Sequence, residues 1–260
     1  AIGNNIILQN VKGKEKIDYA SFDAIGNKTN GTRKDWEFAR AFSIKTNIFE
    51  WLNQLAWESH CELIESINPY TGEKLYKLID LDDGNVDTWT NPAYAGGIEQ
   101  ISGMLSPFEN IFTKFKLRYA YDYGINDFTK ELYVDKNGYP VDATILSSVE
   151  QNLCKYAEDT YYTTRLIELT SMNIYDNSVA ERMLQKKINW LTRQHLIINF
   201  VTPITGNKDW IKYEKGDKVK INFTMSVPTG LNNNKNFIIT NKLITPLIGG
   251  GLIKYRLIEL

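Results

Sequence analysis

Two histidines and two cysteines have the greatest catalytic and metal-binding potential in this chain, and only His60 and Cys61 are adjacent. Consecutive residues of a strand point to opposite faces, so these two form a poor nucleophile–base pair. We expect Cys61 to be buried and His60 to lie on the surface. His195 follows a predicted helix, where it should satisfy the last helix carbonyls or face solvent. Together with Cys154, these residues show no zinc-ligand spacing and cannot form a disulfide framework.

The acidic residues give only weak metal or hydrolase signals. Asp80–Asp87 resembles a calcium loop, but Gly84 is the fifth residue and the twelfth is Asn91, whereas an EF-hand requires glycine sixth and glutamate twelfth. A glycosidase needs two carboxyl groups about 5–10 Å apart across a cleft. Three glutamates lie in or near the predicted hairpin, which are Glu62, Glu65 and Glu73, and their spacing does not require such a pair.

Two other segments contain residue types that occur in ligand sites. Gly249–Gly251 lacks the Lys-Ser/Thr of a phosphate-binding loop and the dinucleotide-binding spacing, so we expect a strand connector there. Exposed aromatic residues in Trp89–Tyr94 could serve an interface or a sugar platform. The sequence therefore predicts no catalytic residue, no cofactor site and no metal site.

Length and composition exclude several classes of protein. The chain has 260 residues, 43% hydrophobic and 23% charged, which is ordinary for one large or two smaller globular domains. No apolar run is long enough for a membrane span. The net charge of −1 and the lack of a basic stripe argue against binding through nucleic-acid phosphates. The chain begins with Ala1 and shows no signal-peptide pattern, which indicates a processed or trimmed product.

The first predicted elements, which would position His60 and Cys61, are a helix packed on a hairpin. Residues 46–60 show apolar side chains at helical spacing, with Thr46 as the expected N-cap. Residues 61–67 and 74–79 read as two strands joined by the Pro- and Gly-containing turn 68–73. Trp51 and Leu55 should anchor the helix in the core. Before it, 4–11 could form a strand and 26–32 an exposed loop.

The middle of the chain alternates between irregular and regular patterns. Residues 80–107 read as a long polar connection, which in a compact domain is usually functional or partly disordered. Residues 112–121 and 128–134 read as strands. Asn137-Gly138 favours a hairpin turn leading into a further strand around 141–145.

Two helices are expected next. The mixed pattern of 148–170 favours helix, and 178–193 shows a clear apolar stripe capped by Asn177 or Ser178. Met183 and Leu184 should anchor this second helix.

The C-terminal part reads as all-β. Gly216, in a tight turn, should need a positive φ. We expect four strands, which are 195–200, 218–227, 237–244 and 252–260. The predicted fold class is α+β and β-rich, with a helix-on-hairpin subdomain and a small C-terminal antiparallel β-barrel or sandwich. The predicted divisions are 1–40 (an N-terminal strand and loop segment), 41–147 (the α+β subdomain) and 148–260 (a helical segment and barrel-like subdomain).

The order of these elements resembles a known family. Phe42–Leu52 opens a helix that leads to a hairpin with an Asn-Pro-Tyr-Thr-Gly-Glu turn, and Glu109–Asp122 resembles a strand of phage tail-tip proteins. Ser178–Leu184 begins a helix followed by a strand and then by Gly-Asp-Lys-Val at 216–219. The chain is thus similar to tail-hub or baseplate-hub proteins of tailed bacteriophages and related injection machines. The resemblance covers residues 42–79, 109–134 and 178–260.

This resemblance implies a structural virion protein of the phage tail and not an enzyme. Such hubs form a ring, expected here as a homotrimer, that joins the tail tube to the spike or fibres. DNA can pass through the ring without specific recognition, and no membrane or cofactor is implied. The alternatives are a carbohydrate- or receptor-binding β-module of a tail fibre or cell-surface protein, and a hydrolase.

Overall fold

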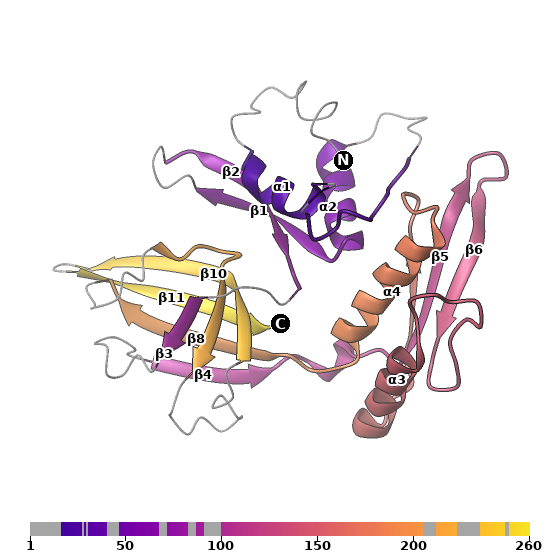
Figure 1. The fold of residues 1–260 in the computed structure, drawn as a ribbon. Coiled ribbons are helices and arrows are strands. Elements are labelled where there is room, and N and C mark those ends of the chain that lie inside the picture. Colours follow the sequence, from indigo (N-terminus) through magenta and orange to yellow (C-terminus); the bar gives the residue numbers. More distant parts are fainter. Residues whose placement is uncertain are drawn as a thin grey trace. The chain divides into compact units, whose positions relative to one another are not determined.

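The computed structural model describes residues 17–27, 29, 31–40, 47–67, 72–82, 87–90, 100–204, 212–222, 235–247 and 250–260 (Figure 1). The chain divides into two compact units. Unit 1 contains residues 1–80 and 107–194, and unit 2 contains residues 81–106 and 195–260. The fold is mixed α+β and rich in strands, as predicted. Within the described ranges, no helix combines the length and apolarity that crossing a membrane would require.

Unit 1 begins with the predicted helix on a hairpin. Its elements are α1 (Tyr19–Gly26), α2 (Ile48–Glu58), β1 (Cys61–Ile67) and β2 (Lys74–Asp80). The two strands are antiparallel, and α2 packs on β1. Both predicted strands are confirmed, whereas α1 lies where no helix was predicted.

The start of α2 is set by Asn47. The Asn47 side chain accepts a hydrogen bond from the Phe49 amide at 3.0 Å. Asn47 thus supplies the N-cap that was predicted for Thr46, which lies outside the described residues. Trp51 and Leu55 are buried, as predicted. The predicted strand 4–11 also lies outside the described residues.

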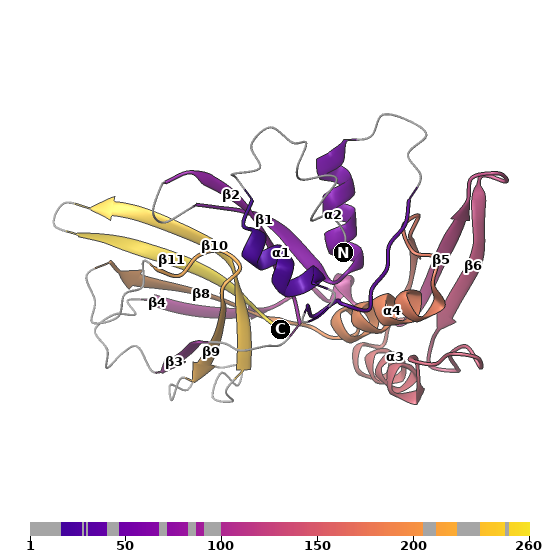
Figure 2. The ribbon, with the colours of Figure 1, turned by 45° about the horizontal axis from the view of Figure 1, so that its top comes forward.

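The second half of unit 1 is a three-stranded sheet covered by two helices. Its elements are β5 (Lys114–Asp122), β6 (Asp127–Val134), α3 (Ser148–Tyr161), β7 (Leu166–Thr170) and α4 (Asn177–Leu191), after a short 3₁₀ helix, Phe108–Asn110. The order is β6-β5-β7, with β6 antiparallel and β7 parallel to β5. Both helices lie on one side of this sheet (Figure 2).

The core of this half joins β5 to α4. Phe115 and Leu117 are fully buried, as are Met183 and Leu184 of α4, in one hydrophobic cluster. The predicted anchoring of the second helix is therefore confirmed. Asp176, not Asn177 or Ser178, caps α4, because its carboxylate accepts the amides of Ser178 and Val179.

Two predictions for this region are wrong. The helix predicted over 148–170 ends at Tyr161, because Tyr162 adopts φ 50° and the chain then enters β7. Tertiary pairing with β5 therefore overrides the local helical pattern. The strand predicted at 141–145 is a series of turns, because its amides are bound by the Glu181 side chain.

Glu181 holds this turn segment to α4. One oxygen, Oε2, accepts the amides of Thr144, Ile145 and Leu146 at 2.8, 2.6 and 3.3 Å. The residue is only 3% exposed. We expect Glu181→Ala to lower the free energy of unfolding by about 2–4 kcal/mol, because it leaves several charge-assisted hydrogen bonds unmade. Urea denaturation measures this loss, with the exposed Glu131→Ala as the control. Equal losses in both variants would contradict the anchoring role.

Unit 2 contains one six-stranded sheet among the described residues. Its strands are β3 (Asp87–Thr90), β4 (Gln100–Leu105), β8 (Leu196–Pro203), β9 (Lys218–Asn222), β10 (Lys235–Leu247) and β11 (Gly250–Glu259). The order is β3-β9-β10-β11-β8-β4, which is open at both ends. No closed barrel is formed by the described strands, and β3 runs parallel to β9. Of the predicted small antiparallel barrel or sandwich, the described strands therefore show a strand-rich sheet but no closed barrel.

The unit 2 sheet nevertheless encloses its own core. Alternate residues of β8 to β11 contribute a cluster in which every side chain is at most 5% exposed, including Phe200, Phe237 and Tyr255. A flat sheet would leave that face open to solvent, and Figure 2 shows that the strands curl strongly. Gly216 adopts φ 89° where its amide donates to the Ile239 carbonyl, as predicted.

The region predicted as a long polar connection contains β3 and β4. Both strands lie at the ends of the described sheet, and each pairs with a strand more than 90 residues later in the chain. Since the pairing partners are so distant in sequence, local patterning within 80–107 gives little indication of these strands.

Candidate functional site

Two ionisable groups with perturbed pKa values, Glu58 and Lys187, lie near the corner between α2 and β1. Helix α2 ends at Ser59, whose hydroxyl donates to the Leu55 carbonyl at 2.8 Å. His60 adopts φ 56° and turns the chain sharply into β1. This tight corner places Glu58 against the segment before α4 and places the Trp57 carbonyl against Lys187.

Glu58 is completely buried and fully hydrogen-bonded. The Asn173 amide group donates to Oε1 and Oε2 at 3.1 and 2.9 Å, and Gln54 Nε2 donates to Oε1 at 2.9 Å. Burial raises the pKa of Glu58, against opposing effects of its hydrogen bonds and of Arg40. Asn173 also accepts the Trp51 indole N–H at 3.2 Å, so one amide connects two residues of α2.

Lys187 of α4 is the second buried charged residue near this corner, and it is 5% exposed. Its Nζ donates to the Trp57 carbonyl at 2.6 Å and lies 3.9 Å from the centre of the Trp57 ring. Burial lowers the pKa of Lys187 to about 8, against opposing effects of Cys61 and Glu58. The carbonyl and the aromatic ring partly replace the water that a lysine would otherwise have.

An acid with a raised pKa beside an amine with a lowered pKa is the pattern of many acid–base sites. Here, however, the carboxylate oxygens of Glu58 and the amine of Lys187 are directed at protein groups. Neither side chain is open to a reactant in this arrangement. The cluster therefore cross-links α2 to α4 and the segment that precedes it.

The adjacent residues His60 and Cys61 lie at this same corner. Cys61 is buried, as predicted, but His60 is only 5% exposed, so the prediction of a surface histidine is wrong. The reason is the ring of Trp190, which packs edge-on to His60 at 5.7 Å. Cys154 lies elsewhere, in the α3 core, where burial raises its thiol pKa to about 12. Neither cysteine forms a disulfide bond in the described structure.

His195 belongs to unit 2 and is also buried. Its Nδ1 lies 3.0 Å from the Glu259 carbonyl oxygen, and its backbone amide donates to the Ser106 hydroxyl. It does not face solvent, because it lies directly before β8 and its ring contacts the carbonyl of Glu259 at the end of β11.

The acidic candidates are dispersed. Asp80 forms an ion pair with Arg33 at 2.7 Å, and Glu65 forms one with Lys74 at 2.7 Å. Within the described segments there is no metal-type grouping of three or more ligand residues. Residues 83–86 of the segment that resembles a calcium loop and Gly249 lie outside the described residues, as do the side chains of Trp89–Tyr94.

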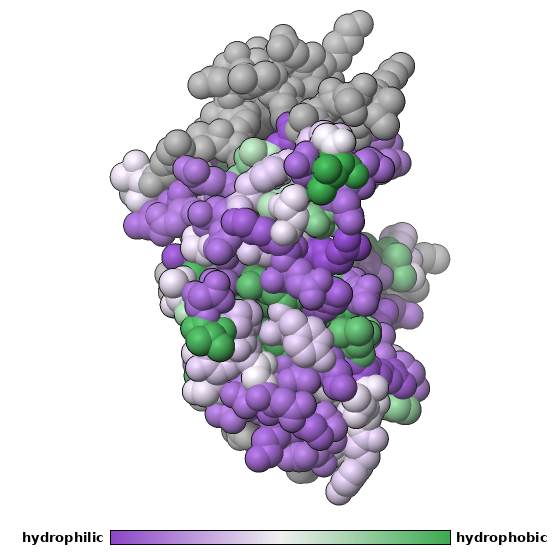
Figure 3. All heavy atoms as spheres, turned by 90° about the vertical axis from the view of Figure 1, so that its right-hand side faces the viewer, coloured by the Kyte–Doolittle hydropathy of each residue, from purple (hydrophilic) through white to green (hydrophobic). Residues whose placement is uncertain are grey.

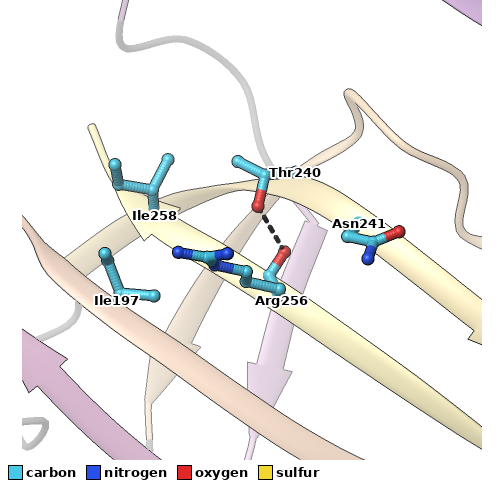
Figure 4. A pocket seen from close by; sticks show the side chains of 5 residues that line it. All are labelled: Ile197, Thr240, Asn241, Arg256 and Ile258. Carbon is cyan, nitrogen blue, oxygen red and sulfur yellow. Dashed lines mark hydrogen bonds between the residues drawn. The ribbon is translucent and has the colours of Figure 1, made fainter.

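A hollow of about 350 Å³ lies on the outer face of the unit 2 sheet (Figure 4). It forms where the register of β10 and β11 shifts between Ile239 and Asn241. Arg256 is the one charged side chain among its lining residues, which are Ile197, Thr240, Asn241, Arg256 and Ile258. A single exposed cation among mostly uncharged groups does not form a catalytic constellation.

Exposed apolar side chains occur on both units. Figure 3 views the side that carries β5 and β6, where hydrophobic residues form separate spots within a hydrophilic surface. In unit 2, Met104 and Leu105 of β4 are 52% and 51% exposed. These residues lie at the end of the described sheet, where a further strand could be added.

Comparisons with known proteins give structural likenesses only. No family model and no curated protein matches the sequence. The fold is similar to the tail protein from Neisseria meningitidis MC58, with a TM-score of 0.47 and 14% identity over 84% of this chain. It is also similar to the 43 kDa tail protein of prophage MuSo2 from Shewanella oneidensis, with a TM-score of 0.43 and 13% identity over 83% of this chain. A third similar structure is prophage tail protein gp18 from Listeria monocytogenes EGD-e, with a TM-score of 0.40 and 12% identity over 81% of this chain. The chain spans 57%, 56% and 52% of those proteins.

Proposed function

We propose that this chain is a structural, non-enzymatic subunit of a phage tail, acting at the tail-tip or baseplate hub. In this proposal, three copies close into a ring that joins the tail tube to the spike or fibres. The protein resides in the virion, and DNA passes through the ring without sequence-specific contacts.

The elements behind the sequence resemblance support this proposal. The helix and hairpin are present as α2, β1 and β2, and the alternating strand is present as β5. The later helix, strand and Gly-Asp turn are present as α4, β8 and the turn before β9.

The observation that carries the ring proposal is the exposed end of the unit 2 sheet. Strand β4 pairs with β8 alone in the described sheet, and its Met104 and Leu105 are half exposed. An apolar edge strand promotes association with other chains. A closed ring would cover such an edge in every copy, because each subunit supplies both surfaces of a heterologous interface.

The particle mass in solution tests this proposal. We expect light scattering to give three times the chain mass, and Met104→Lys to shift the protein towards monomer without changing its circular dichroism. The control is Val141→Lys, which places the same charge at a fully exposed site of unit 1. A chain that stays monomeric at high concentration would contradict the ring.

A second candidate function is carbohydrate binding, favoured by an aromatic cluster at the end of the β5–β6 hairpin. The ring of Tyr121 lies 5.0 Å from Tyr123 and 5.1 Å from Phe128, both edge-on. Tyr123 and Tyr175 are 38% and 39% exposed, so their rings could contact a sugar. A monomer that binds a glycan array, with binding lost in Tyr123→Ala, would favour this alternative over the ring.

A further inference from the structure

Unit 1 contains two separate hydrophobic cores. The smaller one joins α1, α2, β1 and β2 through Ile25, Ala56 and Cys61, with Leu63 and Leu78 packed against it. The larger one joins α3, α4 and the β6-β5-β7 sheet. Contacts between the described helices and strands of the two groups are sparse compared with those inside each group. Each core therefore has its own cooperative packing.

The seam between the cores is polar. We define the seam as Trp51, Glu58, Asn173 and Lys187, which connect α2 to α4 and the preceding segment through the hydrogen bonds described above. Its aromatic contact, His60 against Trp190, also joins the two sides. The hydrogen bonds that cross the seam therefore involve charged or polar groups, beside the buried ring of Trp51.

Charge burial weakens the seam. Glu58 faces Gln54, Ser171 and Asn173, with the charge of Arg40 acting on it, and Lys187 faces Trp57, Cys61 and Glu58. Removing a carboxylate and an ammonium from water costs several kcal/mol each unless close pairing compensates. No direct ion pair between Glu58 and Lys187 is formed in the described structure, so their partners are mainly neutral groups. Opening the seam would rehydrate both charges.

We propose that the seam is a conformational release point, at which α1, α2, β1 and β2 separate from α4 as one unit while both cores stay folded. One of the chain connections between the two sides is the short segment from Arg33 to Trp36, in which the Arg33 guanidinium lies 5.3 Å from the centre of the Trp36 ring. Arg33 stays with the smaller core through its ion pair with Asp80, and Trp36 is buried in the larger core. This device is independent of the ring proposal, since it concerns motion inside one chain.

The two charges set the pH at which opening is easiest. The raised pKa of Glu58 stabilises the closed seam below the ordinary value of 4.5, and this contribution is lost as pH rises through the raised value. The lowered pKa of Lys187 stabilises the closed seam above 10.5, and this contribution is lost as pH falls through about 8. Opening is therefore most favourable at neutral pH, where both groups are charged when open.

Hydrogen exchange of the full chain, read by mass spectrometry, tests the proposal. At neutral pH we expect amides of α2, β1 and β2 to exchange as one group and faster than those of β5 and α4. Lys187→Met should slow the first group by about tenfold or more, since each unit of pKa shift is a factor of ten. It should leave β5 unchanged. The matched control is Lys155→Met, which removes an exposed lysine of α3.

A second measurement keeps the proposal falsifiable if Lys187→Met does not fold. In the unmodified protein, we compare the protection of the α2, β1 and β2 amides at different pH values after correction for intrinsic exchange. This protection should be lowest near neutral pH and should rise at both lower and higher pH. Exchange of both groups at one common rate, with protection that is flat in pH, would show a single cooperative unit and overturn the proposal.

Discussion

Phe115→Ala should lower the free energy of unfolding of unit 1 by about 3–5 kcal/mol, the usual cost of deleting a buried phenylalanine side chain. Phe115 is completely buried near the start of β5, in the cluster that contains Met183 and Leu184. The loss has two parts: the transfer energy of the ring and a cavity that α4 cannot collapse to fill. Urea denaturation followed by tryptophan fluorescence measures the loss.

Phe108→Ala is the matched control for this change. Phe108 is 50% exposed in the short 3₁₀ helix before β5, so its removal should alter stability by about 0.5 kcal/mol or less. A loss below about 1 kcal/mol in Phe115→Ala would mean that the sheet and α4 do not share a core.

Elements with strong local patterns were predictable from the sequence. Helix α2 and the hairpin after it have apolar residues at the spacings that their structures require, and α4 shows the same kind of stripe. Cap residues were less certain, because Asn47 and Asp176 are each one residue away from an equally suitable side chain.

Elements that depend on distant partners were not predictable. Strand β7 follows α3 after a few residues and exists because it pairs in parallel with β5. Strands β3 and β4 depend on β9 and β8, far along the chain. The open order of the unit 2 sheet depends on the same pairings, so the four C-terminal strands alone could not distinguish this sheet from the predicted barrel or sandwich.

The charged seam had a sequence signal that was missed. Glu58 follows Trp51 and Leu55 at seven and three residues, which places its carboxylate on the apolar stripe of α2. Lys187 occupies the corresponding position after Ala180 and Leu184 on α4. A charge on the buried stripe of a helix predicts either a partner or a perturbed pKa, but the partners here, Asn173 and the Trp57 carbonyl, required the tertiary structure.

Trp51→Ala should cost about 3–5 kcal/mol of unfolding free energy, because it removes a large buried ring. Trp51 is 8% exposed, and its indole N–H donates to Asn173 Oδ1 at 3.2 Å. Its loss therefore both empties space beneath α2 and leaves the Asn173 oxygen without its donor. Urea denaturation measures the change.

Trp51→Phe helps to separate these two effects, because it keeps a buried aromatic ring of smaller volume and removes the indole N–H donor. We expect this variant to cost about 1–2 kcal/mol, the range for losing one buried hydrogen bond together with a small volume. If the alanine variant lost less than about 1 kcal/mol, α2 would not pack against its neighbours as described. If both variants lost the same amount, the hydrogen bond to Asn173 would carry the whole effect, and the ring would serve chiefly to position its N–H.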